Sequence, residues 1–252
     1  MPIQDQNAMT LGSDAWVDDV YKSGPSRNSE GRSRPTQRYF GAGLEAINAG
    51  VFEGRNEYIT YLLLCVLQHN RIISRFKGQP FRMNKANHGV DAYPDFMFDL
   101  ADGRRFVLEV KANRFINDDE KKQLEAVNDA FINTSITYLL WTDKWPLHKH
   151  VVHAMNHMRR AYRLGYSTDQ LQPLVNAIQV RPKTLGELCR GVMPAHFDQI
   201  LAAAYCGMIF INFFKPINDQ TLVSCEPDKS IVELLFQTRI KGSTGWDAGI
   251  RC

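Results

Sequence analysis

The sequence predicts an α/β protein with a mixed central sheet, followed by a C-terminal winged-helix-like domain. Residues 95–112 form two strand-like runs around an Asp-Gly turn, and side chains alternate in character along the second run. A helix-forming stretch at 117–131 and a β-branched apolar run at 135–142 come next. Because a strand that follows a crossover helix commonly pairs in parallel, this order predicts both antiparallel and parallel strand pairs.

The elements of the first half follow from local patterns. Apolar residues at helical spacing predict the first helix, whose apolar run at 58–67 is too short to span a bilayer. Asn117 or Asp118 is a suitable N-cap for the second helix. In order, we expect a helix at 53–70, an extended segment at 72–83, strands at 95–100 and 105–112, a helix at 117–131 and a strand at 135–142.

The second half, after Pro146, changes to helices and a short ribbon. Gly165 and Gly207 each stand where a helix is expected to end, which is a frequent position for glycine. The expected elements are helices at 149–165, 184–189 and 194–207 and strands at 208–214 and 221–225. Helices followed by a two-stranded ribbon are the order of a winged-helix domain.

Changes in composition divide the chain into four segments. Residues 1–40 are polar and rich in Gly, Ser, Pro and Arg, which predicts a flexible basic arm that contacts phosphates or a partner, or is only a solvated tail. The α/β domain is expected at 41–146, the winged-helix-like domain at 147–235 and a tail at 236–252. The net charge of +3 is too small to indicate nucleic acid by itself.

Cysteine usage and the N-terminus predict the compartment. The five cysteines are scattered and form no CxxC pair, which argues against a disulfide framework and a zinc knuckle and favours a reducing compartment. No apolar run follows a basic start at the N-terminus, so no signal peptide is expected. We therefore expect a cytoplasmic protein without membrane contact.

The strand RRFVLEVKA places ionisable groups on one face. Phe106, Leu108 and Val110 share the face that should enter the core, and Glu109 and Lys111 share the other. Burying such groups without partners is unfavourable, so something should compensate them. This second face is therefore where chemistry is expected.

The loop between the two strands decides whether Asp95 lies beside Glu109. A two-residue turn would pair Asp95 with Val110, on the wrong side of the sheet. A three-residue loop at 101–103 pairs Asp95 with Glu109 instead. It requires a positive φ at its last position, where Gly103 stands. We predict the three-residue loop, with the two carboxylates as neighbours on one face.

Two neighbouring carboxylates and a lysine point to a particular chemistry. The carboxylates repel each other unless a cation lies between them, and their hard oxygens suit Mg²⁺ or Mn²⁺. Lys111 is no metal ligand while it is charged, but its ammonium can steer water and stabilise the charge that grows on a phosphate. The set predicts metal-assisted phosphodiester hydrolysis. The plain alternative is a salt bridge on a solvent-exposed sheet face.

The spacing of these residues resembles a nuclease signature. Pro94-Asp95, a spacer of thirteen residues and Glu109-Val110-Lys111 match the PD-(D/E)xK motif. The segment VFEGRNEY at 51–58 is similar to a helix start of TnsA-type transposon endonucleases, and Gln79-Pro80 stands where that family has Gln-Pro. Over roughly residues 40–225, the chain resembles this family of the restriction-endonuclease-like superfamily.

The resemblance implies a restriction-endonuclease-like core at 41–146 and an Mg²⁺-dependent endodeoxyribonuclease, in which Mn²⁺ can substitute. Such a chain is the endonuclease subunit of a heteromeric cut-and-paste transposase and cuts double-stranded DNA at the 5′ ends of the transposon. Its partners would be a DDE-type transposase subunit and an AAA+ ATPase regulator, in the bacterial cytoplasm. The winged-helix-like domain would dock one of these proteins.

The resemblance also implies a role for each matching residue. Lys111 matches the catalytic lysine. The matching catalytic acids are Glu57, Asp95 and Glu109, and these three, with the carbonyl of Val110, would be the metal ligands. Glu53, one helical turn earlier, is an alternative to Glu57. Gly54, where the family often has Ser, leaves the helix start less well capped, and Gln79 would be structural or hydrogen-bond near the metal.

Other interpretations stay open. The chain is alternatively a stand-alone PD-(D/E)xK restriction or repair nuclease, or a non-catalytic DNA-binding scaffold of the same fold. The face formed by His150, His153 and His157 is a zinc site, a basic stripe near DNA or a solvated face. Five basic residues near the motif would contact phosphates or merely face solvent: Arg104, Arg105, Arg114, Lys121 and Lys122.

Overall fold

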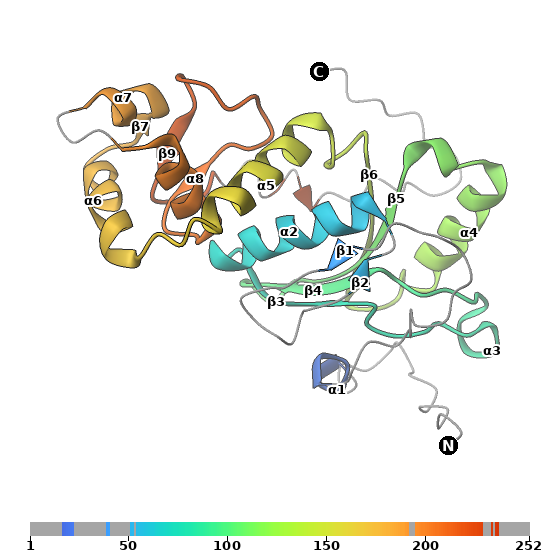
Figure 1. Cartoon of the computed structure of the whole chain (residues 1–252). Helices are drawn as coiled ribbons and strands as arrows, with labels where there is room; N and C mark the ends of the chain where they lie inside the picture. Colours follow the sequence, from blue (N-terminus) through green and yellow to red (C-terminus); the bar gives the residue numbers. More distant parts are fainter. Residues whose placement is uncertain are drawn as a thin grey trace.

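The computed structural model of the chain describes residues 17–22, 39–40, 51–52, 54–191, 195–228, 233, 235 and 236. Its centre is a four-stranded sheet with helices on both faces (Figure 1). The strands are β3 (Ile73–Gly78), β4 (Phe96–Leu100), β5 (Arg105–Lys111) and β6 (Ile136–Thr142), in the order β3-β4-β5-β6. Only β5 and β6 pair in parallel. The predicted α/β class with a mixed sheet is confirmed.

The hairpin of β4 and β5 has the predicted loop. Phe96 pairs with Leu108 and Asp99 with Arg105, which leaves residues 101–103 as the connection. Gly103 has φ +88, the left-handed conformation that the three-residue loop requires. The register prediction is therefore confirmed for the ladder, and it brings Asp95 to the level of Glu109.

Both faces of the sheet are covered by helices. Helices α2 (Arg55–His69) and α5 (Lys149–Tyr162) form one apolar layer, with Phe106, Leu108 and Val110. Helix α4 (Asp118–Asp129) covers the opposite face through Leu124 and Val127, which pack with Val107. The face of β5 that carries Glu109 and Lys111 is therefore covered by α4, although both side chains stay partly exposed.

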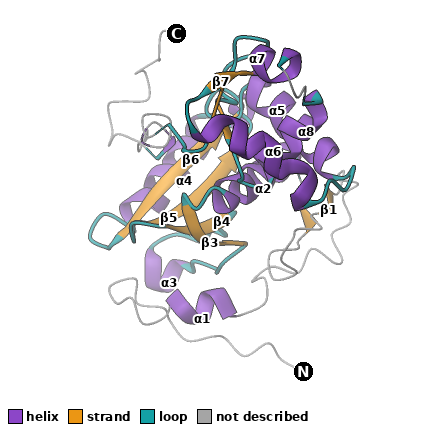
Figure 2. Cartoon of the chain, turned by 90° about the vertical axis from the view of Figure 1, so that its left-hand side faces the viewer, coloured by secondary structure: helices purple, strands orange, loops and turns teal. Residues whose placement is uncertain are grey.

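Part of the expected arm is a helix attached to the core. Helix α1 (Val17–Lys22) buries Val17 and Val20 below the sheet, on the side where the short helix α3 (Lys85–His88) also lies (Figure 2). The ammonium of Lys77 donates to the carbonyl of Val20. Strand β1 (Tyr39–Phe40) pairs with β2 (Val51–Phe52). The rest of the predicted arm at 1–40 lies outside the described residues.

The C-terminal part contains one helix and one strand more than predicted. Its elements are α5, described above, followed by α6 (Thr168–Gln179), β7 (Lys183–Thr184), α7 (Leu185–Arg190), α8 (Phe197–Tyr205), β8 (Phe210–Ile211) and β9 (Leu222–Ser224). The strands form an antiparallel sheet in the order β7-β9-β8. Helix α6 was not predicted, although a capping box of Ser167 and Gln170 begins it; Pro173, which lacks a backbone donor, lies inside it.

One apolar cluster joins the two parts of the chain across the predicted boundary at 146/147. Helix α5 packs on α2 and on α8, and the His69 ring at the end of α2 contacts the carbonyl of Tyr205 at 2.6 Å. Near the expected tail, Phe236 is buried against Phe98 and Phe106, with ring centroids 5.5 and 5.3 Å away. The C-terminal part therefore packs against the part that contains the four-stranded sheet, and it also presents a surface of its own.

No helix within the described ranges is both long and apolar enough to cross a lipid bilayer.

Candidate active site

Asp95 stands just before β4, at the end of the hairpin. Its backbone N–H donates to the carbonyl of Leu108 (3.1 Å), the residue before Glu109. The regular pairing of β4 with β5 therefore ends at Phe96. Its side-chain Oδ2 accepts the N–H of Val110 at 2.7 Å. Its carbonyl accepts the N–H of Gln79, also at 2.7 Å, and Gln79 has φ +48. Backbone groups on both sides therefore hold Asp95, and the structural role predicted for Gln79 agrees with this contact.

The surroundings of Asp95 favour its protonated form. Burial raises the pKa of its carboxyl well above the ordinary value, and the negative charges of Glu109 and Glu57 raise it further. The Val110 N–H and the charge of Lys111 act in the opposite direction but do not compensate. The surrounding groups therefore do not compensate the negative charge of ionised Asp95, and a carboxylate in this condition binds a cation.

Lys111 bridges two carboxylates. Its Nζ lies 3.0 Å from Oε1 of Glu109 and 2.9 Å from Oε1 of Glu120, on the first turn of α4. The exposed fraction of the side chain rises from 13% for Glu109 to 25% for Glu120 and 32% for Lys111. Lys111 is therefore the most exposed side chain of the three.

The protonation of these groups follows from the contacts. Burial alone would lower the pKa of Lys111, but Glu109 and Glu120 reverse this effect and raise it. Burial raises the pKa of Glu109, although Lys111 counteracts the rise. Lys111 therefore stays an ammonium near neutral pH and acts by its charge, not as a base.

Glu57 occupies the first turn of α2, at the same end of the sheet. Its carboxylate turns back over the helix start, because a Cβ added at Gly54 would lie 3.4 Å from Oε1 of Glu57. Gly54 thus leaves room for this carboxylate, and a serine at position 54 would narrow that room. Glu53, the alternative to Glu57, lies outside the described residues.

The four predicted residues are neighbours, but they do not converge on one point. Within the described residues, no three His, Cys, Asp or Glu side chains are close enough to hold a metal ion. The carboxylates of Asp95 and Glu109 are each turned to another donor, the Val110 N–H and the Lys111 ammonium. The hard oxygen donors fit Mg²⁺, and coordination would require these side chains to rotate.

Sequence reasoning missed Glu120 and Tyr138. Tyr138 lies on β6, opposite Val107 and on the same face as Glu109. It is 2% exposed, and its hydroxyl has no hydrogen-bond partner in the structure. The N-cap that starts α4 at Asn117 predicts a helix, but not which of its side chains reach the strand.

The basic residues divide into two groups, which corrects the expectation that all five lie near the site. Arg105 pairs with Asp99 at 3.0 Å and Arg104 with Asp102 at 2.8 Å. A strand rises about 3.3 Å per residue, so Arg105 is roughly 20 Å from Lys111. On the site's side, Lys121 and Lys122 form exposed pairs along α4, and the Arg114 guanidinium lies 4.7 Å from the ring centroid of Phe115.

The histidines of α5 form only a pair. The rings of His153 and His157 are 4.1 Å apart, while His150 lies closer to His148, at 5.5 Å. Across the part of the chain that the structure describes, no third acid, His or Cys completes a metal site with His153 and His157. The zinc interpretation therefore gains no support.

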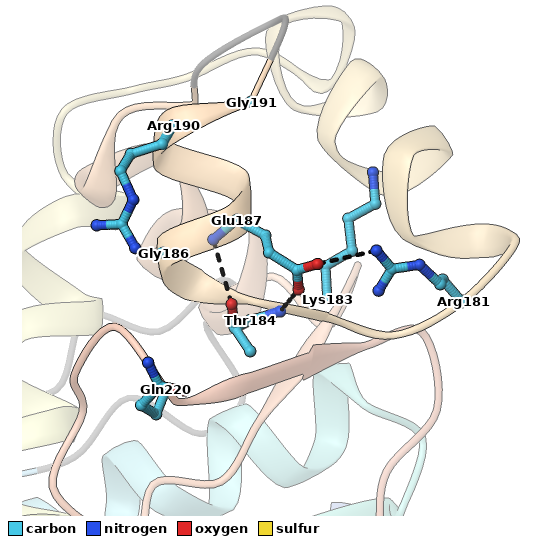
Figure 3. Close-up of a pocket in the computed structure, with 8 residues that line it drawn as sticks. All are labelled: Arg181, Lys183, Thr184, Gly186, Glu187, Arg190, Gly191 and Gln220. Atoms are coloured by element: carbon cyan, nitrogen blue, oxygen red, sulfur yellow. Dashed lines mark hydrogen bonds and ion pairs between the residues drawn. The ribbon is translucent and has the colours of Figure 1, made fainter.

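A separate surface pocket lies in the C-terminal part (Figure 3). Its lining residues are Arg181, Lys183, Thr184, Gly186, Glu187, Arg190, Gly191 and Gln220. The carboxylate of Glu187 contacts Arg181 at 2.8 Å, and Arg190 contacts Asp219 at 2.7 Å. Acids of the same chain already neutralise both arginines, which leaves Lys183 as the remaining basic side chain of the lining.

Comparison with known proteins found no matching family model and no matching curated protein.

Proposed function

We propose that this chain is a divalent-metal-dependent DNA endonuclease that hydrolyses phosphodiester bonds. The observation that carries the proposal is the contact of Lys111 with Glu109 beside the half-buried Asp95, whose pKa burial and neighbouring negative charges raise. A structural salt bridge explains Lys111 and Glu109, but it leaves unexplained why Asp95 is placed among like charges. A cation at Asp95 explains all three residues together.

The residues proposed to hold Mg²⁺ are Asp95, Glu109, Glu57 and the carbonyl of Val110. When bound, the ion would supply Lewis-acid activation of water and of the phosphate. The N–H of Val110 holds the Asp95 carboxylate in the metal-free protein, and rotation toward the ion would give up this hydrogen bond. Lys111, released from Glu109, would place its ammonium on a phosphate oxygen and stabilise the charge that develops there.

The setting that we propose is a heteromeric cut-and-paste transposase. The three helices and the antiparallel sheet of the C-terminal part have the element order of a winged-helix domain with an added helix. His196 and Gln199 cap helix α8, since the N–H of His196 donates to Oε1 of Gln199 at 2.9 Å. The Gln199 side chain therefore has a local task, and protein docking is a better use of this domain than base recognition.

Cleavage by the purified chain tests the proposed activity. Supercoiled plasmid and linear double-stranded DNA should be nicked with Mg²⁺ or Mn²⁺ and left intact with EDTA, and the products should carry 5′-phosphate and 3′-hydroxyl ends. A transposase and an ATPase encoded beside this chain should be added in a parallel assay. Absence of metal-dependent nicking in both assays would contradict the proposal and favour a non-catalytic scaffold.

The same assay separates the two nuclease settings. A transposase subunit should require its partner and cut at transposon ends, because the partner delivers the DNA. Cleavage by the chain alone, at unrelated sequences and at the same rate with or without the partner, would instead indicate a stand-alone restriction or repair nuclease.

A further inference from the structure

The Tyr138 hydroxyl is a donor without an acceptor, enclosed behind the acidic group. The side chain is 2% exposed, and no hydrogen-bond partner of the hydroxyl is present in the structure. The charged groups around it are Glu109, Asp95 and Glu120, in decreasing order of their effect on its pKa, which burial and these three charges raise. The phenol therefore keeps its proton and can donate it to an acceptor.

Packing fixes the direction of this hydroxyl. The ring stacks on Phe131 with centroids 6.0 Å apart and planes 2° from parallel. Val107 and Leu124 belong to the same buried cluster as the ring. Because close-packed rings do not swing freely, the hydroxyl cannot escape to solvent without moving α4.

The burial of Tyr138 limits which ligand its hydroxyl can have. A DNA phosphate is too large to reach a side chain that is almost wholly buried, whereas a water molecule needs only a polar cavity and two or more partners. The hydroxyl supplies a donor, and the carboxylates of Glu109 and Glu120 supply acceptors. A water bonded to all three would satisfy the phenol and connect it to the acids.

We propose that Tyr138 is a positioning residue that acts through one internal water molecule on the two acids that hold Lys111. Glu109 and Glu120 contact the ammonium from different elements, β5 and α4. When Glu109 turns to the metal and releases Lys111, Glu120 still holds the ammonium. A water shared with the Tyr138 hydroxyl would keep the Glu120 carboxylate in place and thereby the position of Lys111. Tyr138 would then contribute to catalysis without touching DNA.

A crystal structure of the metal-free wild-type protein tests the water directly. We expect ordered density within about 3.2 Å of the Tyr138 hydroxyl oxygen and within the same range of at least one of the two carboxylates. An empty or apolar space beside the hydroxyl would overturn the proposal. This measurement does not depend on any enzymatic activity.

Kinetics of Tyr138→Phe test the positioning role, which rests on the proposed nuclease function. The variant keeps the ring and removes only the hydroxyl. We expect kcat to fall about tenfold, with KM for DNA and Mn²⁺ affinity changed less than about twofold, as loss of one hydrogen bond predicts. In a Glu120→Gln background, Tyr138→Phe should have almost no further effect on kcat, because both side chains act through the same water-mediated contact.

Tyr61→Phe is the matched control. Tyr61 is also 2% exposed, but it lies on α2, on the other face of the sheet, so this variant should cleave at the wild-type rate. If wild-type protein cleaves DNA and Tyr138→Phe does so equally fast, the positioning role is wrong and the nuclease proposal stands. If wild-type protein does not cleave, the nuclease proposal fails, and the crystallographic water still decides the inference.

Discussion

Replacing Lys111 with alanine should reduce the rate of DNA cleavage by about 10²- to 10³-fold, the range measured when a group that stabilises transition-state charge is removed. The physical reason is that Lys111 is the most exposed member of its group and carries a firmly held positive charge. DNA affinity should change little, because phosphate contacts elsewhere set the binding. Single-turnover cleavage and filter binding measure the two quantities separately.

The Lys111→Ala variant should also differ from the wild type in its melting temperature. Without the ammonium, Glu109 and Glu120 repel each other, so the metal-free protein should melt at a lower temperature than the wild type. A divalent ion can replace the lost charge, so Mg²⁺ should restore more of the melting temperature in the variant than in the wild type.

Lys122→Ala controls for a general loss of positive charge. Lys122 is 77% exposed and lies 3.8 Å from Asp119 on the outer face of α4. It should leave cleavage and melting temperature near the wild-type values. Equal loss of cleavage in both variants, or a normal rate for Lys111→Ala, would show that Lys111 has no special role.

Replacing Asp95 with asparagine should abolish cleavage and at the same time stabilise the metal-free protein. Asparagine retains an oxygen that can accept the Val110 N–H, and it removes the charge that burial, Glu109 and Glu57 oppose. We expect the affinity for Mg²⁺ to fall more than about 100-fold, since loss of a ligand should exceed the 10- to 100-fold cost of losing an outer partner. Calorimetric titration measures the affinity, and thermal melting measures the stability.

The stability difference should depend on pH with a defined sign. The pKa of Asp95 is higher in the folded protein than the value of about 3.9 of an unfolded chain, so between these two values the folded state binds more protons. The free energy of unfolding of the metal-free wild type should therefore decrease as the pH rises through this window. Relative to wild type, Asp95→Asn should show a flatter curve and its largest advantage above the window. A wild type that loses stability on acidification in this window, with no difference from the variant, would contradict the environment described for Asp95.

The site could be predicted from sequence as far as the hairpin determines it. Loop length and Gly103 fix the register of β4 and β5, and register brings Asp95 to Glu109 and Lys111. Such local rules act within one hairpin, where each residue's face follows from simple alternation.

The remaining errors concern distances and contacts between elements, which the alternation of side chains along a strand does not predict. Arg104 and Arg105 were placed near the site because they are close to Lys111 in sequence, but an extended strand separates them from it. Glu120 was missed because its contact depends on how α4 is turned and docked against β5. Tyr138 was missed because in a buried strand a tyrosine looks like any other core residue. The helix α6 was not predicted, although the capping box of Ser167 and Gln170 marks its start.

The most direct test of the account is the location of Mn²⁺ in crystals of the wild-type protein, determined by anomalous diffraction. The account predicts a peak at the end of the sheet, with carboxylate oxygens of Asp95 and Glu109 within about 2.0–2.6 Å and Lys111 turned toward solvent. A map with no peak beside Asp95 at saturating Mn²⁺, or with density only at the His153 and His157 pair, would contradict it.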